Sequence, residues 1–144
     1  MTPPRPVLRV FWALHRGLRR ATGGRLGTSR ASSDRIGTLF LHTVGRKSGR
    51  RRVNGLFYLL DGPDLVVVAS NAGAAADPAW WLNLRDRPDA EVETNGRRRP
   101  VRARPATDDE TARVWPRLVA ANPDYDAYRA KASRPIPVVM LGPR

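Results

Sequence analysis

Apolar and polar residues alternate in several short runs between residues 36 and 141. Glycine, proline, asparagine and aspartate separate the runs, which is typical of β-strands joined by tight turns. The predicted strands span 36–44, 53–60, 65–70, 90–94, 98–104 and 136–141. Six short strands with few helices favour a small barrel over a sandwich. The predicted fold class is therefore mainly β, of the α+β type, with helices at the periphery.

Local signals place the hairpin and the helices. Asn95-Gly96 between two strands predicts a two-residue hairpin turn. Pro78 suits the first turn of a short helix. Thr107 followed by Glu110 is a capping-box pattern at the start of a helix. The last two helices are predicted over 108–121 and 124–132.

The first 33 residues follow another pattern. On a helix over residues 5–20, apolar side chains would form one stripe, with arginines largely on the other side. The stripe consists of Val7, Phe11, Leu14 and Leu18. Such a helix could pack on the domain or lie on anionic lipid. We therefore predict a basic amphipathic helix and linker over 1–33 and a barrel domain over 34–144.

Composition narrows the chemistry. The chain has 26 Lys and Arg against 13 Asp and Glu, a net charge of +13, which attracts nucleic acid, anionic lipid or small anionic molecules. It has no cysteine, so thiolate catalysis and disulfides are excluded. His15 and His42 show no metal-binding spacing, so no metal site is expected.

Three clusters of residues could carry function. The first is the turn from Gly45 to Arg52, whose glycines could let backbone N–H groups point at an anion while Arg46, Lys47, Ser48 and Arg52 add charge and a hydroxyl. It matches neither a P-loop nor a Rossmann fingerprint. The alternative is a solvated basic hairpin, or one that contacts nucleic-acid phosphates.

The second cluster runs from Ala69 to Gly73 and continues into the short helix. Ser70 and Asn71 could donate hydrogen bonds beside a flat ring, and an aromatic wall suits stacking. Residues Pro78, Trp80, Trp81 and Asn83 would complete the cluster. The alternative is that the tryptophans are core anchors, although a lone helix could not turn both inward.

The third cluster is a pair of phenols. Tyr125 and Tyr128 are three residues apart, so they share a helical face and could donate hydrogen bonds to a substrate oxygen. Half-buried packing is the alternative reading.

Taken together, these segments resemble the deazaflavin-dependent nitroreductase family, the F420H2-dependent quinone reductases. Three motifs occur in the family's order over about residues 36–141. They are Leu41-x-Thr43-x-Gly45-Arg46-Lys47-Ser48-Gly49-x-x-Arg52-x-Asn54, then Ala69-Ser70 with Pro78-Ala79-Trp80-Trp81-Leu82-Asn83-Leu84, and finally Trp115-Pro116, Pro123-x-Tyr125-x-x-Tyr128 and Arg134-x-Ile136-Pro137-Val138.

The resemblance implies a split β-barrel that binds coenzyme F420 and assigns a role to each motif. Arg46, Lys47, Ser48 and Arg52 would grip the phosphate and oligoglutamate tail. The deazaflavin ring would lie against Asn54, Ser70, Asn71, Pro78, Trp80 and Asn83. The catalytic residues bordering the substrate would be Ser70, Tyr125 and Tyr128. Gly55, Asn71 and Asn122 depart from the family pattern, and Asn122 puts nitroimidazole activation in doubt.

The implied activity is hydride transfer from reduced deazaflavin to a quinone or nitro-type acceptor, in an actinobacterial protein. The cofactor carries the chemistry, so no strong acid or base is required. The alternatives are a non-catalytic F420 carrier and an FMN- or haem-binding protein on the same barrel. A nucleic-acid binder is disfavoured because the aromatic residues lie outside the arginine-rich turn. The expected location is cytoplasmic, with the N-terminal helix as a peripheral attachment to the inner face of the membrane. The oligomeric state is left open.

Overall fold

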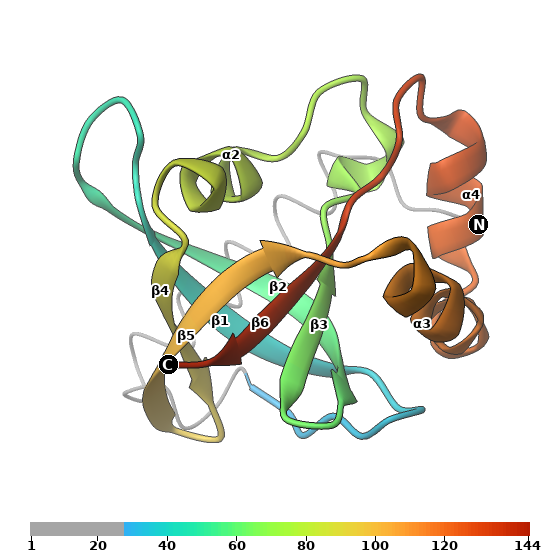
Figure 1. Cartoon of the computed structure of the whole chain (residues 1–144), viewed down its shortest axis with the longest axis horizontal. Helices are drawn as coiled ribbons and strands as arrows, with labels where there is room; N and C mark the ends of the chain where they lie inside the picture. The colour runs from blue at the N-terminus through green and yellow to red at the C-terminus, as the bar shows by residue number, and fades with distance from the viewer. Residues whose placement is uncertain (1–27) are drawn as a thin grey trace.

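The computed structural model describes residues 28–144 and shows a closed antiparallel barrel with the strand order β1-β2-β3-β6-β5-β4 (Figure 1). Its strands are β1 (Gly37–Val44), β2 (Arg51–Asp61), β3 (Asp64–Val68), β4 (Asp89–Thr94), β5 (Arg97–Pro105) and β6 (Val138–Pro143). Its helices are η1 (Asn71–Gly73), α2 (Ala79–Asp86), α3 (Asp108–Ala121) and α4 (Asp124–Lys131). Pairing of β1 with β4 closes the ring. The predicted barrel with peripheral helices is confirmed.

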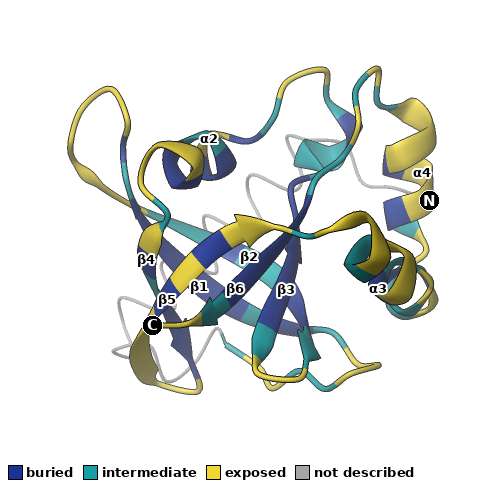
Figure 2. Cartoon of the chain, viewed as in Figure 1, coloured by how far each residue is buried: buried dark blue, intermediate teal, exposed yellow. Residues whose placement is uncertain are grey.

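The barrel interior follows from the alternation along the strands, since successive side chains point to opposite faces. Leu39 and Leu41 of β1 face inward and are completely buried, as are Val139 and Leu141 of β6. Helix α2 covers one end of the barrel and inserts apolar side chains into this core (Figure 2). The core is therefore a filled barrel closed by a helix.

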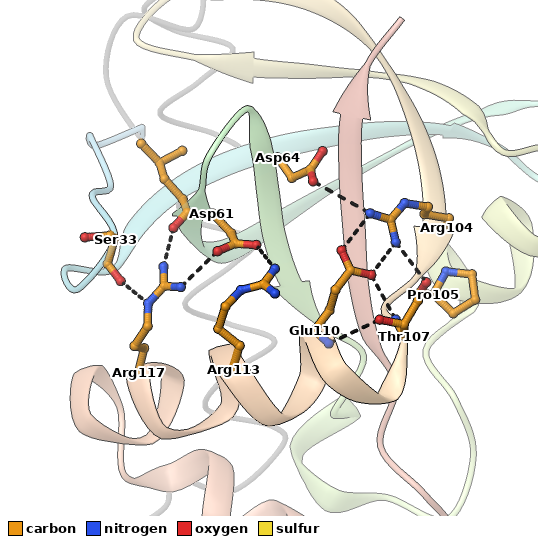
Figure 3. A network of polar contacts seen from close by, with 10 residues as sticks. Ser33, Asp61, Asp64, Arg104, Pro105, Thr107, Glu110, Arg113 and Arg117 are labelled. Carbon is orange, nitrogen blue, oxygen red and sulfur yellow. Dashed lines mark hydrogen bonds and ion pairs between the residues drawn. The ribbon is translucent and has the colours of Figure 1, made fainter.

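A second apolar cluster lies outside the barrel, under α3 and α4. Outward-facing Val66 and Met140 pack there against Val114 and Leu118 of α3. Polar contacts at the rim of α3 fix the helix further (Figure 3). Because α4 also packs on this cluster, the two helices form a flank of the barrel and not its lid.

The predicted turn and cap chemistry is present. Asn95 and Gly96 have φ of 52° and 74°, the left-handed values that a two-residue hairpin requires. Thr107 accepts the Glu110 backbone N–H, and the Glu110 carboxylate accepts the Thr107 N–H. The capping box that the sequence predicted therefore begins α3.

The predicted N-terminal helix lies outside the described residues. The described part of the predicted linker, residues 28–33, is bonded to the barrel: Ser29 forms a β-bridge with Thr38, and the Thr28 hydroxyl accepts the Asn95 N–H at 3.0 Å. The domain boundary near residue 33 stays a prediction. Residues 28–33 are attached to the barrel at the end that carries Asn95 of the β4–β5 turn.

Candidate functional site

Two of the predicted site segments emerge at the same end of the barrel. Strand β2 is antiparallel to both β1 and β3, so the β1–β2 turn and the segment after β3 lie at one end. Helix α2 lies across this end (Figure 1). Topology therefore brings together two segments that are separated in sequence by the whole of β2 and β3.

The β1–β2 turn is built by its glycines and its serine. Gly45 and Arg50 are joined by a hydrogen bond of 2.8 Å from the Gly45 N–H to the Arg50 carbonyl. The Arg50 N–H in turn donates to Ser48 Oγ at 3.1 Å. A Cβ at residue 45 would lie 2.7 Å from that oxygen, so any other residue would force the Ser48 side chain to move. Gly49 adopts a φ of 69°, which also favours glycine.

Most backbone amides of this turn are already used. Those of Gly45, Arg46, Gly49 and Arg50 donate to other protein atoms. Among residues 28–144, the amides of Lys47 and Ser48 have no such acceptor. Fewer backbone N–H groups are thus available to bind an anion than the two glycines suggested. The turn would attract anions chiefly through its charged side chains.

Five cations, three in the turn and two at the start of β2, lack a carboxylate partner within the described chain. They are Arg46, Lys47, Arg50, Arg51 and Arg52, all exposed to solvent. Arginines elsewhere are partly paired: Arg104 lies 2.6 Å from Glu110 and Arg113 lies 2.7 Å from Asp61, whereas others in the described chain, such as Arg85, have no carboxylate within ion-pair distance. Positive charge is therefore left unneutralised at the end of the barrel that carries the predicted site, which favours an anionic ligand there.

Asn83 connects α2 to this turn. Its side chain is 4% exposed; Oδ1 accepts the Arg46 N–H at 3.1 Å, and Nδ2 donates to Thr43 Oγ1 at 3.2 Å. Both polar ends of Asn83 are thus engaged inside the protein. Asn83 therefore supports the turn from the protein side, and its contact with a deazaflavin ring stays a prediction.

Trp80 and Trp81 are both buried, at 5% and 6% exposure, in the barrel core. Two adjacent residues can both be buried because α2 fills the end of the barrel, so more than one face of the helix contacts the protein interior. A ring so covered offers little surface for stacking, so the packing alternative describes both tryptophans well. Asn54 is half-buried and lies opposite Leu41 on the inner side of β2.

The segment after β3 carries the second predicted cluster. Ser70 and Asn71 are half-buried, and Pro78 is buried where α2 begins. The Asn71 side chain donates to the Ala76 carbonyl at 3.0 Å and so braces the segment itself. Helix α4 packs on η1: a Cβ at Gly73 would lie 3.2 Å from the Tyr128 carbonyl oxygen.

The tyrosines of α4 are buried, Tyr125 at 5% and Tyr128 at 8% exposure. Their rings meet edge to face at 6.5 Å, and Trp115 lies 6.4 Å from Tyr125. Burial raises the pKa of both phenols above the ordinary value. Within residues 28–144 neither hydroxyl has a hydrogen-bond partner, so each remains a protonated donor without an acceptor.

Within the described residues, no group of three acidic, histidine or cysteine side chains could hold a metal ion. No helix in that part of the chain is long and apolar enough to cross a membrane.

The closed barrel, capped at one end by the tryptophan-bearing helix α2, has the split β-barrel fold that the sequence predicted. The family model described as F420H(2)-dependent quinone reductase matches residues 12–143. The chain belongs to this family of F420-dependent oxidoreductases, as the sequence motifs predicted.

Known proteins agree with this assignment. Rv3178 of Mycobacterium tuberculosis, named for F420H(2)-dependent quinone reduction, is 44% identical over 109 residues, which cover 76% of this chain and 92% of that protein. The F420H(2)-dependent quinone reductase Rv1261c of the same organism is 37% identical, over 89% of this chain and 87% of its own. The solved F420-H2 dependent reductase FDR-A superimposes with a TM-score of 0.65 at 27% identity, over 78% of this chain and 98% of its own.

Proposed function

We propose that the chain transfers a hydride from reduced coenzyme F420 to a quinone or nitro-type acceptor. The observation that carries this proposal is the set of five cations without carboxylate partners in the β1–β2 turn and at the start of β2. A phosphate followed by a glutamate tail is an anion of matching sign and extent. Family membership supplies the identity of the cofactor.

The residues present fit such a group. Arg46, Lys47 and Arg52 would hold phosphate and tail carboxylates through charge-assisted hydrogen bonds, with Ser48 beside them. When bound, the reduced deazaflavin supplies the hydride. The protein's part is to fix the ring against Asn54 and the segment from Ser70 to Pro78, including Asn71. Trp80 and Asn83 would support this wall from the barrel side, as their burial indicates.

Ser70, Tyr125 and Tyr128 are the proposed catalytic residues. Each phenol is protonated at neutral pH, and burial raises its pKa still further above that range. A protonated hydroxyl without an acceptor in the protein can donate to an acceptor oxygen as negative charge builds on it. This role needs no acid or base that titrates near pH 7.

The test is equilibrium titration of the protein with F420 and with FMN, read by tryptophan fluorescence. We expect F420 to bind more tightly than FMN. Lys47→Ala should weaken F420 binding by about 1–3 kcal/mol, the scale of a lost hydrogen bond to a charged group. The matched control is Arg102→Ala, which removes an exposed cation of β5 and should leave affinity unchanged.

Tighter binding of FMN would contradict the proposal and favour the FMN-protein alternative. Tight F420 binding without any oxidation of the reduced cofactor by a quinone would instead indicate the carrier alternative. Equal F420 affinity of Lys47→Ala and wild type would favour the alternative interpretation of the turn as a solvated basic hairpin.

A further inference from the structure

Arg134, between α4 and β6, is bonded to the segment that carries Ser70. Its Nη2 donates to the carbonyls of Ala69 at 3.2 Å and Ser70 at 3.0 Å, and its Nε donates to the Ala74 carbonyl at 3.1 Å. Its Nη1 lies 2.7 Å from Asp77 Oδ1. The side chain is 13% exposed. One guanidinium thus spans residues 69–77, hereafter the β3–α2 loop.

Two residues of the β3–α2 loop have strained backbone conformations. Asn71 and Ala72 have φ of 46° and 54°, left-handed values that are unfavourable for residues with a Cβ. Such conformations persist where the surroundings over-determine them, and they cluster at ligand sites. Within the loop, the Gly73 N–H donates to the Ser70 carbonyl, which also accepts from Arg134. Arg134 therefore binds the loop next to its strained residues.

Only arginine has the geometry for this role. Its planar guanidinium offers five N–H donors in a fixed fork, whereas lysine offers a single point of charge. A lysine at 134 could keep the pair with Asp77, but it could not at the same time reach the carbonyls on either side of Asn71 and Ala72. The carbonyl contacts, more than the charge, are what hold the loop.

We propose that Arg134 is a positioning residue that sets the β3–α2 loop in the conformation that coenzyme F420 meets. The proposal rests on the proposed function, because it assumes that Ser70 and Asn71 face the cofactor. Arg134 itself acts through the loop. The sequence motif contains this arginine, but its spacing alone assigns it no partner.

The experiment compares Arg134→Gln and Arg134→Lys with Arg117→Gln. Arg117 is a matched control because it too is multiply bonded, to Asp61 at 3.0 Å and to the carbonyls of Ser33 and Leu60, at the other end of the barrel (Figure 3). Hydrogen exchange is measured on the protein without cofactor. F420 affinity is measured by titration, and thermal midpoints are recorded for all variants.

For Arg134→Gln we expect exchange at the Gly73 and Ala74 amides to rise about tenfold, with the strand amides unchanged. F420 dissociation constants should rise about tenfold. Arg134→Lys should show most of both effects while folding as wild type. Arg117→Gln, at a similar loss of thermal midpoint, should show neither.

Unchanged loop exchange in both Arg134 variants would overturn the proposal, whatever the cofactor does. Faster exchange with wild-type F420 affinity would overturn it as well, because the loop would then not be positioned for the cofactor. If the wild-type protein does not bind F420, the proposed function fails, and with it the part of this proposal that concerns the cofactor. The exchange data still decide whether Arg134 holds the loop.

Discussion

At the scale of single residues, the phenols of α4 show how burial sets chemical character. Tyr125 lies among the apolar side chains between α4 and the outer wall of the barrel. A buried hydroxyl without a partner is costly, by about 1–3 kcal/mol. Such a cost is tolerated where the group serves a ligand, or where packing of the ring outweighs it. The two explanations give different results when the hydroxyl is removed.

We expect Tyr125→Phe and Tyr128→Phe to lower kcat/KM with a quinone while F420 affinity holds, because a donor to the acceptor oxygen acts in the transition state. Steady-state kinetics with a quinone and F420 titration are the measurements. Trp115→Phe, a change in the same aromatic cluster, is the control and should keep kcat/KM near wild type. Wild-type rates in both tyrosine variants, with unchanged or higher thermal stability, would make the phenols packing residues.

Residue by residue, the sequence predicted identities better than orientations. It placed Lys47 and Arg52 in an exposed basic turn; both are exposed, with Lys47 in the turn, but β2 already begins at Arg51 and includes Arg52. It could not show that Asn83 points inward to Arg46 and Thr43, because a hydrogen-bond partner 37 or 40 residues away leaves no local pattern. The burial of both tryptophans of α2 could not be predicted from helix periodicity. Periodicity assumes that a helix has one buried face, and this assumption fails for a helix that fills the end of a barrel.

At the scale of elements, strands and helices were predictable to within a few residues. The expected strand over 136–141 begins at Val138, because Pro137 has no N–H to donate and Ile136 precedes a proline. The β3–α2 loop could not be foreseen, since its carbonyls accept hydrogen bonds from Arg134, more than fifty residues away. Local signals thus predicted the elements, while long-range polar contacts shaped the loops.

The capping box of α3 gives a test at this scale. Thr107→Ala should destabilise the protein by about 1 kcal/mol, because the Glu110 N–H loses its acceptor. Denaturant unfolding monitored by circular dichroism measures the loss. The control, Thr111→Ala, replaces the same residue type inside the helix with a better helix former and should cause no loss. Equal losses in both variants would show that the cap contributes nothing specific.

At the scale of the whole molecule, the peripheral membrane attachment predicted from the N-terminal stripe remains a prediction. Each arginine near an anionic surface contributes on the order of 1 kcal/mol. The full chain should therefore bind anionic vesicles at low salt and dissociate as salt screens the charges. Vesicle sedimentation at several salt concentrations measures this.

The structure sharpens the control for that experiment. Residues 28–33 are bonded to the barrel, so the deletion should stop at residue 27 and leave Thr28 in place. The shortened protein should lose vesicle binding and keep F420 affinity. If vesicle binding survives the deletion, the barrel itself makes the membrane contact. If the full chain does not bind anionic vesicles even at low salt, the membrane prediction is wrong.

The order of strands around the barrel has a consequence for synthesis on the ribosome. Strand β6 lies between β3 and β5, pairing Leu65 with Leu141 and Ala103 with the same residue. Until β6 has left the exit tunnel, β3 and β5 each present an open edge on the nascent chain, and open edges invite pairing with other chains. Closure of the barrel is thus a late event. The nascent chain is most accessible to chaperones, and most prone to aggregate, in the interval before β6 pairs with β3 and β5.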